Sequence, residues 1–353
     1  MTTNLGLPTM GGLAEVPTTD EEYSAKDFTS DQEVRWCPGC GDYAVLAAVR
    51  GFLPELGIKR ENTVFVSGIG CSARFPYYMN TYGMHSIHGR APTIATGLAT
   101  TRPDLSVWVV TGDGDGLSIG GNHLIHALRR NVNITVLLFN NRIYGLTKGQ
   151  YSPTSDQGTV TKSTPVGSVD TPFNPVSLAL GAEAGFVART LDSDRAHLTE
   201  TLRAAAAHRG ASLVEIYQNC PIFNDGAFDV LKDKDEKQRR LIQLRHGEPV
   251  TFGPEDERFG VVRDERGELR VAKLDEIDER DLVIHDAHRE DTGHAFALSR
   301  LGGQDLDPTV TGVFRAVDRP TYDDQARQQL DDAARQRPAD LQRLLTGRDT
   351  WTI

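Results

Sequence analysis

Two neighbouring stretches, Ser106-Val-Trp-Val-Val-Thr-Gly-Asp-Gly-Asp-Gly116 and Ile134-Thr-Val-Leu-Leu-Phe-Asn-Asn141, give the first indication of the fold. Each begins with an apolar run bounded by Gly or Asn, a pattern typical of a buried strand in a parallel sheet. The glycines of the first stretch allow the backbone to approach a phosphate, and a helix that starts there favours negative charge. We expect Ser118 to be the N-cap of that helix.

Asp113 and Asn141 stand at the ends of these two predicted strands. Because the carboxyl ends of parallel strands meet at one edge of a sheet, the two side chains can share one Mg²⁺ that holds a diphosphate. Two alternatives remain. A tight turn alone explains the glycines, and Gly68-Ile-Gly-Cys-Ser-Ala73 matches a dinucleotide fingerprint. No acidic residue stands about 20 residues further on to bind a ribose, which disfavours the dinucleotide.

Apolar strands alternate with amphipathic helices along most of the chain. We expect strands at residues 63–67, 106–110, 134–140, 186–190 and 212–217, and helices at 42–53, 93–100, 119–130, 176–184 and 196–208. This βαβ repetition predicts an α/β fold with a doubly wound, mostly parallel sheet and helices on both faces.

The sequence divides into three parts. Residues 1–30 lack periodicity and predict an N-terminal arm that wraps a partner or stays mobile. Residues 31–228 carry the motifs and are expected to form the cofactor-binding domain. Residues 229–353 contain charge-dense segments and predict a helical or irregular C-terminal extension.

The net charge of −11 argues against a nucleic-acid-binding surface. Neither a run of 18 apolar residues nor an N-terminal signal segment is visible, so we expect a soluble, cytoplasmic protein without membrane contact. Acidic residues are absent between Asn62 and Pro103. A buried core explains this gap, and so does a local site for an anionic ligand.

The chain contains four cysteines, and all four are candidates for one metal centre. Cys37-Pro-Gly-Cys40 brings two thiolates within reach of one centre, while Cys71 and Cys220 follow predicted strands and can converge at one sheet edge. Pro221 follows Cys220, as a proline follows the last ligand of many ferredoxin motifs. A thioredoxin-like dithiol leaves two cysteines without a role, and a structural zinc site usually has a second CxxC pair.

Together these motifs resemble those of 2-oxoacid:ferredoxin oxidoreductase beta subunits. Gly112-Asp-Gly114 followed by Asn140-Asn141 is similar to the thiamine-diphosphate signature, and Trp36-Cys-Pro-Gly-Cys-Gly-Asp42 resembles the cluster loop of that family. The resemblance spans residues 30–230. Three further stretches resemble the family, especially its 2-oxoglutarate members: Gly68-Ile-Gly-Cys-Ser-Ala-Arg74, Ser86-Ile-His-Gly-Arg-Ala91 and Ile143-Tyr-Gly-Leu-Thr-Lys-Gly-Gln150.

The resemblance implies the thiamine-diphosphate-binding fold and three cofactors: thiamine diphosphate, Mg²⁺ and one [4Fe-4S] cluster. It assigns the cluster to Cys37, Cys40, Cys71 and Cys220, and Mg²⁺ to Asp113, Asn141 and the carbonyl of Ile143. The residues expected along the cofactor are Gly70, Cys71, Gly112, Asp113, Gly114, Asp115, Asn141, Ile143, Gly145 and Leu146.

The family converts a 2-oxoacid and coenzyme A to an acyl-CoA and CO₂, and its cluster passes the electrons singly to ferredoxin. The resemblance therefore implies oxidation of 2-oxoglutarate to succinyl-CoA, with ferredoxin as a partner. Pyruvate and branched-chain 2-oxoacids are alternative substrates. A cluster-free thiamine-diphosphate decarboxylase and a zinc-bearing, non-catalytic subunit are alternative functions.

Several functional residues are expected around the cofactor. In thiamine enzymes a Glu from a second, pyrimidine-binding domain activates the cofactor, so we expect an alpha subunit to supply it, in a heterodimer or a dimer of heterodimers. His88 and Arg90 are the catalytic candidates, although His88 also fits a structural role. Arg74 and Lys148 are candidates for the distal carboxylate of 2-oxoglutarate, or else solvated or diphosphate-facing cations.

Overall fold

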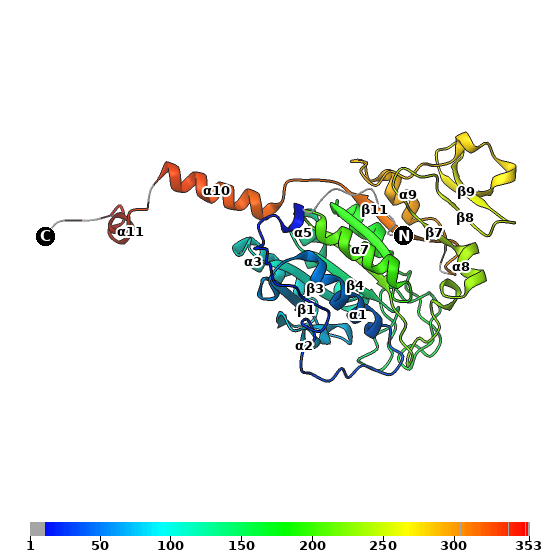
Figure 1. Cartoon of the computed structure of the whole chain (residues 1–353), viewed down its shortest axis with the longest axis horizontal. Helices are drawn as coiled ribbons and strands as arrows, with labels where there is room; N and C mark the ends of the chain where they lie inside the picture. Colours follow the sequence, from blue (N-terminus) through cyan, green and yellow to red (C-terminus); the bar gives the residue numbers. More distant parts are fainter. Residues whose placement is uncertain (1–10, 304, 338, 350, 352–353) are drawn as a thin grey trace.

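The computed structural model describes residues 11–303, 305–337, 339–349 and 351. Its central layer is an eight-stranded sheet with the strand order β2-β1-β3-β4-β6-β5-β11-β7 (Figure 1). The six strands from β2 to β5 in this order run parallel, β11 is antiparallel to β5, and β7 is parallel to β11. The predicted doubly wound, mostly parallel sheet is therefore confirmed. The strands are β1 (Thr63–Ser67), β2 (Tyr82–His85), β3 (Ser106–Gly112), β4 (Thr135–Asn140), β5 (Phe186–Leu191), β6 (Ser212–Tyr217), β7 (Leu241–Gln243) and β11 (Thr309–Ala316).

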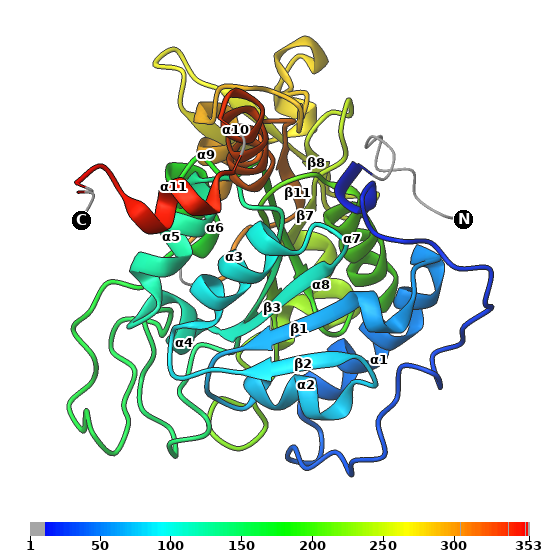
Figure 2. The same ribbon diagram turned by 90° about the vertical axis from the view of Figure 1, so that its left-hand side faces the viewer.

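Helices cover both faces of the sheet (Figure 2). Alternate residues of β3 belong to opposite cores: Val107 and Val109 to one, Trp108 and Val110 to the other. Because both faces are buried, the strands read as continuous apolar runs, and each large apolar side chain contributes about 1.5 to 3 kcal/mol. One core includes α1 (Asp42–Phe52) and α7 (Arg195–Ala207), and the other includes α3 (Ala91–Thr101), α5 (Gly121–Arg129), α6 (Pro175–Gly181) and α9 (Gly293–Ser299).

Polar caps and a glycine set the limits of these helices. Asp194 begins α7 and Asn174 begins α6, each by accepting a hydrogen bond from the backbone N–H three residues on. Helix α1 continues into a short 3₁₀ helix, η2 (Leu53–Leu56), which Gly57 ends in the left-handed conformation at φ 61°. The helix predicted over residues 42–53 is thus confirmed to within one residue.

The glycine-rich motif after β3 differs from its prediction. Residues 113–117 themselves form a short helix, α4 (Asp113–Leu117), and Ser118 lies at its C-terminal end. The prediction that Ser118 is an N-cap is wrong, because the extended backbone of Gly112 (ψ 164°) turns the strand directly into a helix. Asp113 is consequently the first helical residue, and α5 begins only after Gly120.

The C-terminal part contains the expected helices and also strands that the sequence pattern did not predict. Strands β7 and β11 extend the main sheet, so the sheet continues across the proposed boundary at residues 228/229, which remains a prediction. A second, antiparallel sheet has the order β10-β9-β8. The additional elements are β8 (Thr251–Phe252), β9 (Phe259–Arg263), β10 (Leu269–Lys273), α8 (Lys234–Arg240), α10 (Tyr322–Gln336) and α11 (Leu341–Thr346).

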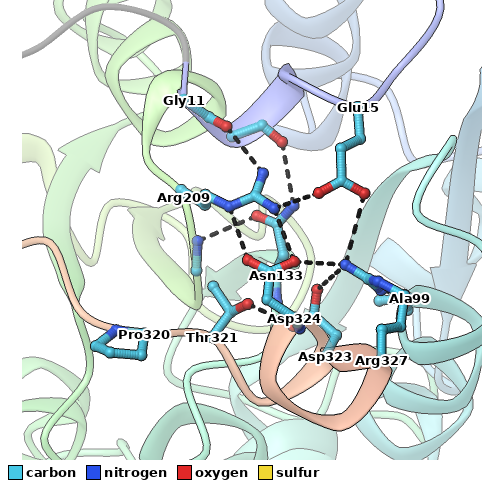
Figure 3. Close-up of polar contacts among 12 residues, drawn as sticks. Gly11, Glu15, Ala99, Asn133, Arg209, Pro320, Thr321, Asp323, Asp324 and Arg327 are labelled. Atoms are coloured by element: carbon cyan, nitrogen blue, oxygen red, sulfur yellow. Dashed lines mark hydrogen bonds and ion pairs between the residues drawn. The ribbon is translucent and has the colours of Figure 1, made fainter. Parts of the chain in front are cut away.

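The N-terminal segment packs against its own domain from residue 11 onward, and its first ten residues lie outside the described part. Phe28 is buried in the core beside α1. Arg209, which lies just after α7, forms ion pairs with Glu15 and Asp324 and so joins this segment to α10 (Figure 3). Arg327 of α10 also pairs with Asp324. These contacts attach α10 to the body, from which α10 and α11 then extend (Figure 1).

Among the described helices, none combines the length and the apolar character that crossing a bilayer demands.

Helix α2 (Phe75–Tyr78) and strand β2 were also not predicted. All four residues of β2 are exposed at the edge of the sheet, which removes the apolar signal of a buried strand.

Candidate active site

The residues that follow β1, β3 and β4 surround a cavity of about 120 Å³. All ten residues expected along the cofactor line this cavity, and so does His88. The ten come from the loop after β1, from the end of β3, from α4 and from the segment after β4, and His88 follows β2. The motifs that lie far apart in the sequence therefore meet at the carboxyl edge of the sheet, where open α/β sheets bind ligands.

Asp113 is buried at the start of α4. Its Oδ2 accepts hydrogen bonds from the hydroxyls of Ser152, at 2.5 Å, and Thr154, at 2.6 Å. Burial raises the pKa of this carboxyl to about 6, although the two hydroxyls lower it. The surroundings therefore disfavour an isolated negative charge at Asp113, and a nearby cation would offset that cost.

The side chains of Asn141 and its neighbour Asn140 have different hydrogen-bond partners. The Asn141 amide nitrogen donates to Oε1 of Gln218 at 3.0 Å, and its Oδ1 accepts from the backbone N–H of Ile143 at 3.2 Å. The Asn140 amide nitrogen instead donates to the buried carboxylate of Glu215 at 2.7 Å. Asn141 lines the cavity, whereas Asn140 is buried and is not among its lining residues.

Asp115 ties together two loops beside the cavity. Its Oδ1 accepts from the backbone N–H groups of Ile69 (3.1 Å) and Gly89 (2.8 Å), and it lies 2.6 Å from Nδ1 of His88. A Cβ added at Gly68 would lie 1.8 Å from the Asp115 Oδ2, so the glycine permits this close packing. The Asp115 carboxylate is therefore already bound by groups of the protein itself, and it positions both loops and the His88 ring.

Replacing Asp115 by Ala is expected to destabilise the protein by at least about 2 kcal/mol, because two backbone N–H groups lose their acceptor. The midpoint of denaturant unfolding measures this loss. Asp256→Ala, at an exposed loop position, is the matched control and should leave the midpoint unchanged. Equal midpoints for both variants would contradict the role of Asp115 in holding the loops.

The four cysteines gather on one side of the cavity. A Cβ added at Gly145 would lie 3.5 Å from Sγ of Cys71 and 3.6 Å from Sγ of Cys220, so both sulfur atoms face this glycine. Sγ of Cys40 accepts a hydrogen bond from the Gln218 amide at 3.2 Å, and Cys37 is exposed one turn earlier. Within the described residues, no three His, Cys, Asp or Glu side chains stand ready to hold a metal ion.

The thiols and a neighbouring carboxyl influence one another electrostatically. Burial raises the pKa of the Cys71 thiol to about 11, with further contributions from Asp42, Cys220 and Cys37. Burial also raises the pKa of Cys40 far above its usual range. Asp42, fully buried at the start of α1, has its pKa raised to about 7 by burial. A metal that binds here must therefore displace protons from these thiols.

The remaining predicted residues lie outside the lining of the cavity. Arg90 precedes α3 and donates to the carbonyl of Ile119 at 3.2 Å. Arg74 donates to the carbonyl of Arg35 at 3.4 Å. Lys148 is exposed in the turn after Gly145. The structure thus brings His88 to the cavity and leaves Arg90, Arg74 and Lys148 around it.

Sequence reasoning missed several side chains of the site. Ser152 and Thr154 hold Asp113 from 39 and 41 residues away, and Gln218 reaches Cys40 across 178 residues. The hydroxyl-rich stretch Ser152-Pro-Thr-Ser155 was the only available signal for the first two. A single glutamine after a strand carries no comparable signal.

The fold and this cavity define a thiamine-diphosphate-binding domain. Residues 68–216 match the family model described as thiamine pyrophosphate enzyme, C-terminal TPP binding domain. This match covers β3, β4 and the loops after β1 and β4, which supply most of the residues that line the cavity.

Comparison of the whole chain identifies its family. A 2-oxoglutarate oxidoreductase subunit KorB from Mycobacterium tuberculosis is 66% identical over 99% of this chain and 94% of its own length. A 2-oxoacid:ferredoxin oxidoreductase subunit beta from Sulfolobus is 42% identical over 63% of this chain and 72% of its own. A solved 2-oxoglutarate:ferredoxin oxidoreductase from Magnetococcus marinus, with 2-oxoglutarate, coenzyme A and succinyl-CoA bound, has a TM-score of 0.75 and 33% identity, covering 94% of this chain and 98% of that one. This chain belongs to the family of 2-oxoacid:ferredoxin oxidoreductase beta subunits.

Proposed function

We propose that this chain is the beta subunit of a 2-oxoglutarate:ferredoxin oxidoreductase. With an alpha subunit it converts 2-oxoglutarate and coenzyme A to succinyl-CoA and CO₂, and the electrons pass to ferredoxin. One observation carries the proposal: the cavity at the sheet edge is lined by Asp113 and Asn141 and also by Cys71. A site for a metal-held diphosphate and a site for a redox centre are therefore adjacent.

The residues of the cavity fit Mg²⁺ and thiamine diphosphate. Asp113, Oδ1 of Asn141 and the carbonyl of Ile143 offer the hard oxygen ligands that Mg²⁺ prefers. Burial raises the pKa of the Asp113 carboxyl because a lone negative charge is unfavourable there, and a bound cation would offset that unfavourable energy. When bound, thiamine diphosphate supplies the nucleophilic carbon and the electron sink for decarboxylation. Ser152 and Thr154 hold the Asp113 carboxylate in place for the cation.

The cysteines fit a [4Fe-4S] cluster. Such a cluster takes four thiolates, one for each iron atom, so its ligands surround a common space and need not meet at one point. The sulfur atoms of Cys71 and Cys220 face the same glycine. Cys220 and Cys37 also contribute to the raised pKa of the Cys71 thiol, which places them near it. These contacts support one shared centre for the four cysteines.

The rim of the cavity supports an interface with an alpha subunit. Two apolar side chains that line it are exposed, Leu146 by 49% and Ile69 by 38%, and Ile87, next to the lining residue His88, is exposed by 72%. Among the described residues that line the cavity, the acidic ones are aspartates, and no glutamate is present. We therefore assign the Glu that activates the cofactor to the alpha subunit.

Lys148 is proposed to bind the distal carboxylate of 2-oxoglutarate, with Arg74 as the second candidate. Lys148 is exposed and follows Leu146 and Thr147, which line the cavity. Lys148→Ala is expected to raise the KM for 2-oxoglutarate about tenfold or more, because a charged hydrogen bond is worth about 1.5 to 3 kcal/mol. Lys162→Ala, at another exposed loop position, is the control. An equal rise in the KM for pyruvate would rule out a role in substrate choice.

Activity of the two-subunit complex tests the proposed function. The chain is produced anaerobically with its alpha subunit and offered 2-oxoglutarate, pyruvate and branched-chain 2-oxoacids, with coenzyme A and ferredoxin. We expect coenzyme A-dependent reduction of ferredoxin, fastest with 2-oxoglutarate, and no turnover by this chain alone. Preference for another 2-oxoacid would reassign the substrate. Decarboxylation without iron in the protein would establish the cluster-free alternative.

A further inference from the structure

Gln218 lies between the two groups of candidate ligands. It follows β6 directly, and only 1% of its surface is exposed. Its Oε1 accepts a hydrogen bond from the Asn141 amide nitrogen at 3.0 Å, and its Nε2 donates to Sγ of Cys40 at 3.2 Å. One side chain therefore contacts a candidate ligand of the cation and a candidate ligand of the cluster.

The neighbours of Gln218 determine which end of its amide faces the sulfur. Nε2 also donates to the carbonyl oxygen of Asn219 at 2.5 Å. A reversed amide would place Oε1 against the carbonyl oxygen of Asn219, where no hydrogen is available to share, and against a sulfur that would carry no hydrogen once it binds a cluster as a thiolate. It would also turn an NH₂ group toward the NH₂ group of Asn141. The orientation with N–H toward Cys40 is thus the one that satisfies every partner.

Backbone contacts and close packing keep this side chain in place. The Gln218 N–H donates to the carbonyl of Asn140 at 3.0 Å, and the Gly41 N–H donates to the carbonyl of Asn219 at 3.0 Å. A Cβ added at Gly41 would lie 2.9 Å from Cγ of Gln218 and 1.9 Å from Oδ2 of Asp192. The glycine after the CxxC motif therefore permits the cysteine loop to pack directly on Gln218.

We propose that Gln218 is a positioning residue shared by both centres: it orients the Asn141 amide for the divalent cation and raises the reduction potential of the cluster through Cys40. This inference rests on the proposed function. By holding the Asn141 nitrogen, Gln218 leaves Oδ1 as the atom available to the cation. Reduction adds negative charge to a cluster and its sulfur ligands, so an N–H that donates to Cys40 stabilises the reduced form.

Two substitutions separate these two effects. Gln218→Glu keeps an oxygen that can accept from Asn141 but removes the N–H to Cys40. At alkaline pH, where the carboxylate carries no proton, it is expected to lower the reduction potential and to retain most of the Mg²⁺ affinity. Gln218→Leu removes both contacts. It is expected to lower the potential and also to weaken Mg²⁺ binding by about 10- to 100-fold, as loss of an outer-shell partner does.

The measurements use the complex of this chain with its alpha subunit. Redox titration followed by electron paramagnetic resonance gives the cluster potential, and retention of thiamine diphosphate at graded Mg²⁺ concentrations gives the cation affinity. Gln157→Leu is the matched control, since Gln157 is exposed and bonds only to the carbonyl of Val169 among the partners the structure records. This control should behave like the unsubstituted complex in both measurements.

The outcomes distinguish this inference from the proposed function. If the unsubstituted complex contains iron and both Gln218 variants keep its potential and its Mg²⁺ affinity, the shared positioning role is wrong while the function stands. If the unsubstituted complex contains no cluster, the proposed function fails first and the inference fails with it. Should Gln218→Leu lose its cluster altogether, an unchanged potential in Gln218→Glu still overturns the N–H donation to Cys40.

Discussion

Replacing Asp113 by Asn is expected to lower kcat/KM for 2-oxoglutarate on the order of 1000-fold, since a catalytic metal stabilises charge by several kcal/mol and each 1.36 kcal/mol is a factor of ten. Asp113 is the one carboxylate predicted among the Mg²⁺ ligands. Asparagine has a similar shape, so the pocket should persist while the charge that holds the cation is lost. The loss should be smaller at high Mg²⁺ concentration, because mass action partly restores occupancy.

Steady-state kinetics of the two-subunit complex at several Mg²⁺ concentrations measures this effect. Asp104→Asn is the matched control, because the Asp104 side chain is partly exposed and pairs with Arg102 outside the cavity. Its kcat/KM should equal that of the unsubstituted complex. If Asp113→Asn retained full activity and full thiamine diphosphate content, Asp113 would not be a ligand of the cation.

Replacing Glu215 by Leu is expected to destabilise the protein by about 3 to 5 kcal/mol, the usual cost of breaking a buried ion pair by removing one partner. The Glu215 side chain is fully buried and lies 2.6 Å from Nε of Arg189, whose side chain is 6% exposed. The substitution leaves Nε of Arg189 and the Asn140 amide without their acceptor, and the Arg189 cation retains the neutral acceptors of Val310 and Asn174 in place of a counter-charge. Because Asn140 precedes Asn141, cofactor affinity should fall as well.

A double substitution tests the cause of this loss. Arg189→Met combined with Glu215→Leu removes both buried charges, so it should be more stable than Glu215→Leu alone in denaturant unfolding. Asp104→Leu, which breaks the exposed pair with Arg102, is the control and should change the unfolding free energy very little. If the double substitution lost as much unfolding free energy as the two single substitutions added together, an unpaired buried charge would not be the cause.

The sequence pattern predicted the central strands because each is buried on both faces. In β3 and β4 this burial demands continuous apolar runs, here of Val, Leu, Trp and Phe, which are easy to recognise. Strand β11 is equally buried but carries Gly312 and Arg315, and these residues interrupt its apolar run. Strand β2 is exposed along its whole length, so it gave no signal.

The candidate site could be predicted where topology alone determines it. Asp113 and Asn141 end strands that are adjacent and parallel, so both had to reach the same edge of the sheet. The contacts of Ser152 and Gln218 depend instead on the path of long loops, which no periodicity describes. Asp115 had the expected position in the motif, yet its carboxylate binds the protein's own loops.

We propose that a metal-held diphosphate and an iron-sulfur cluster occupy adjacent sites at one edge of the sheet. Anomalous X-ray diffraction at the iron edge, on anaerobically grown crystals of the complex with its alpha subunit, tests it most directly. We predict iron enclosed by Cys37, Cys40, Cys71 and Cys220, and a separate divalent ion between Asp113 and Asn141 next to thiamine diphosphate. Zinc in place of iron at the four cysteines, or a cation bound away from Asp113, would contradict the account.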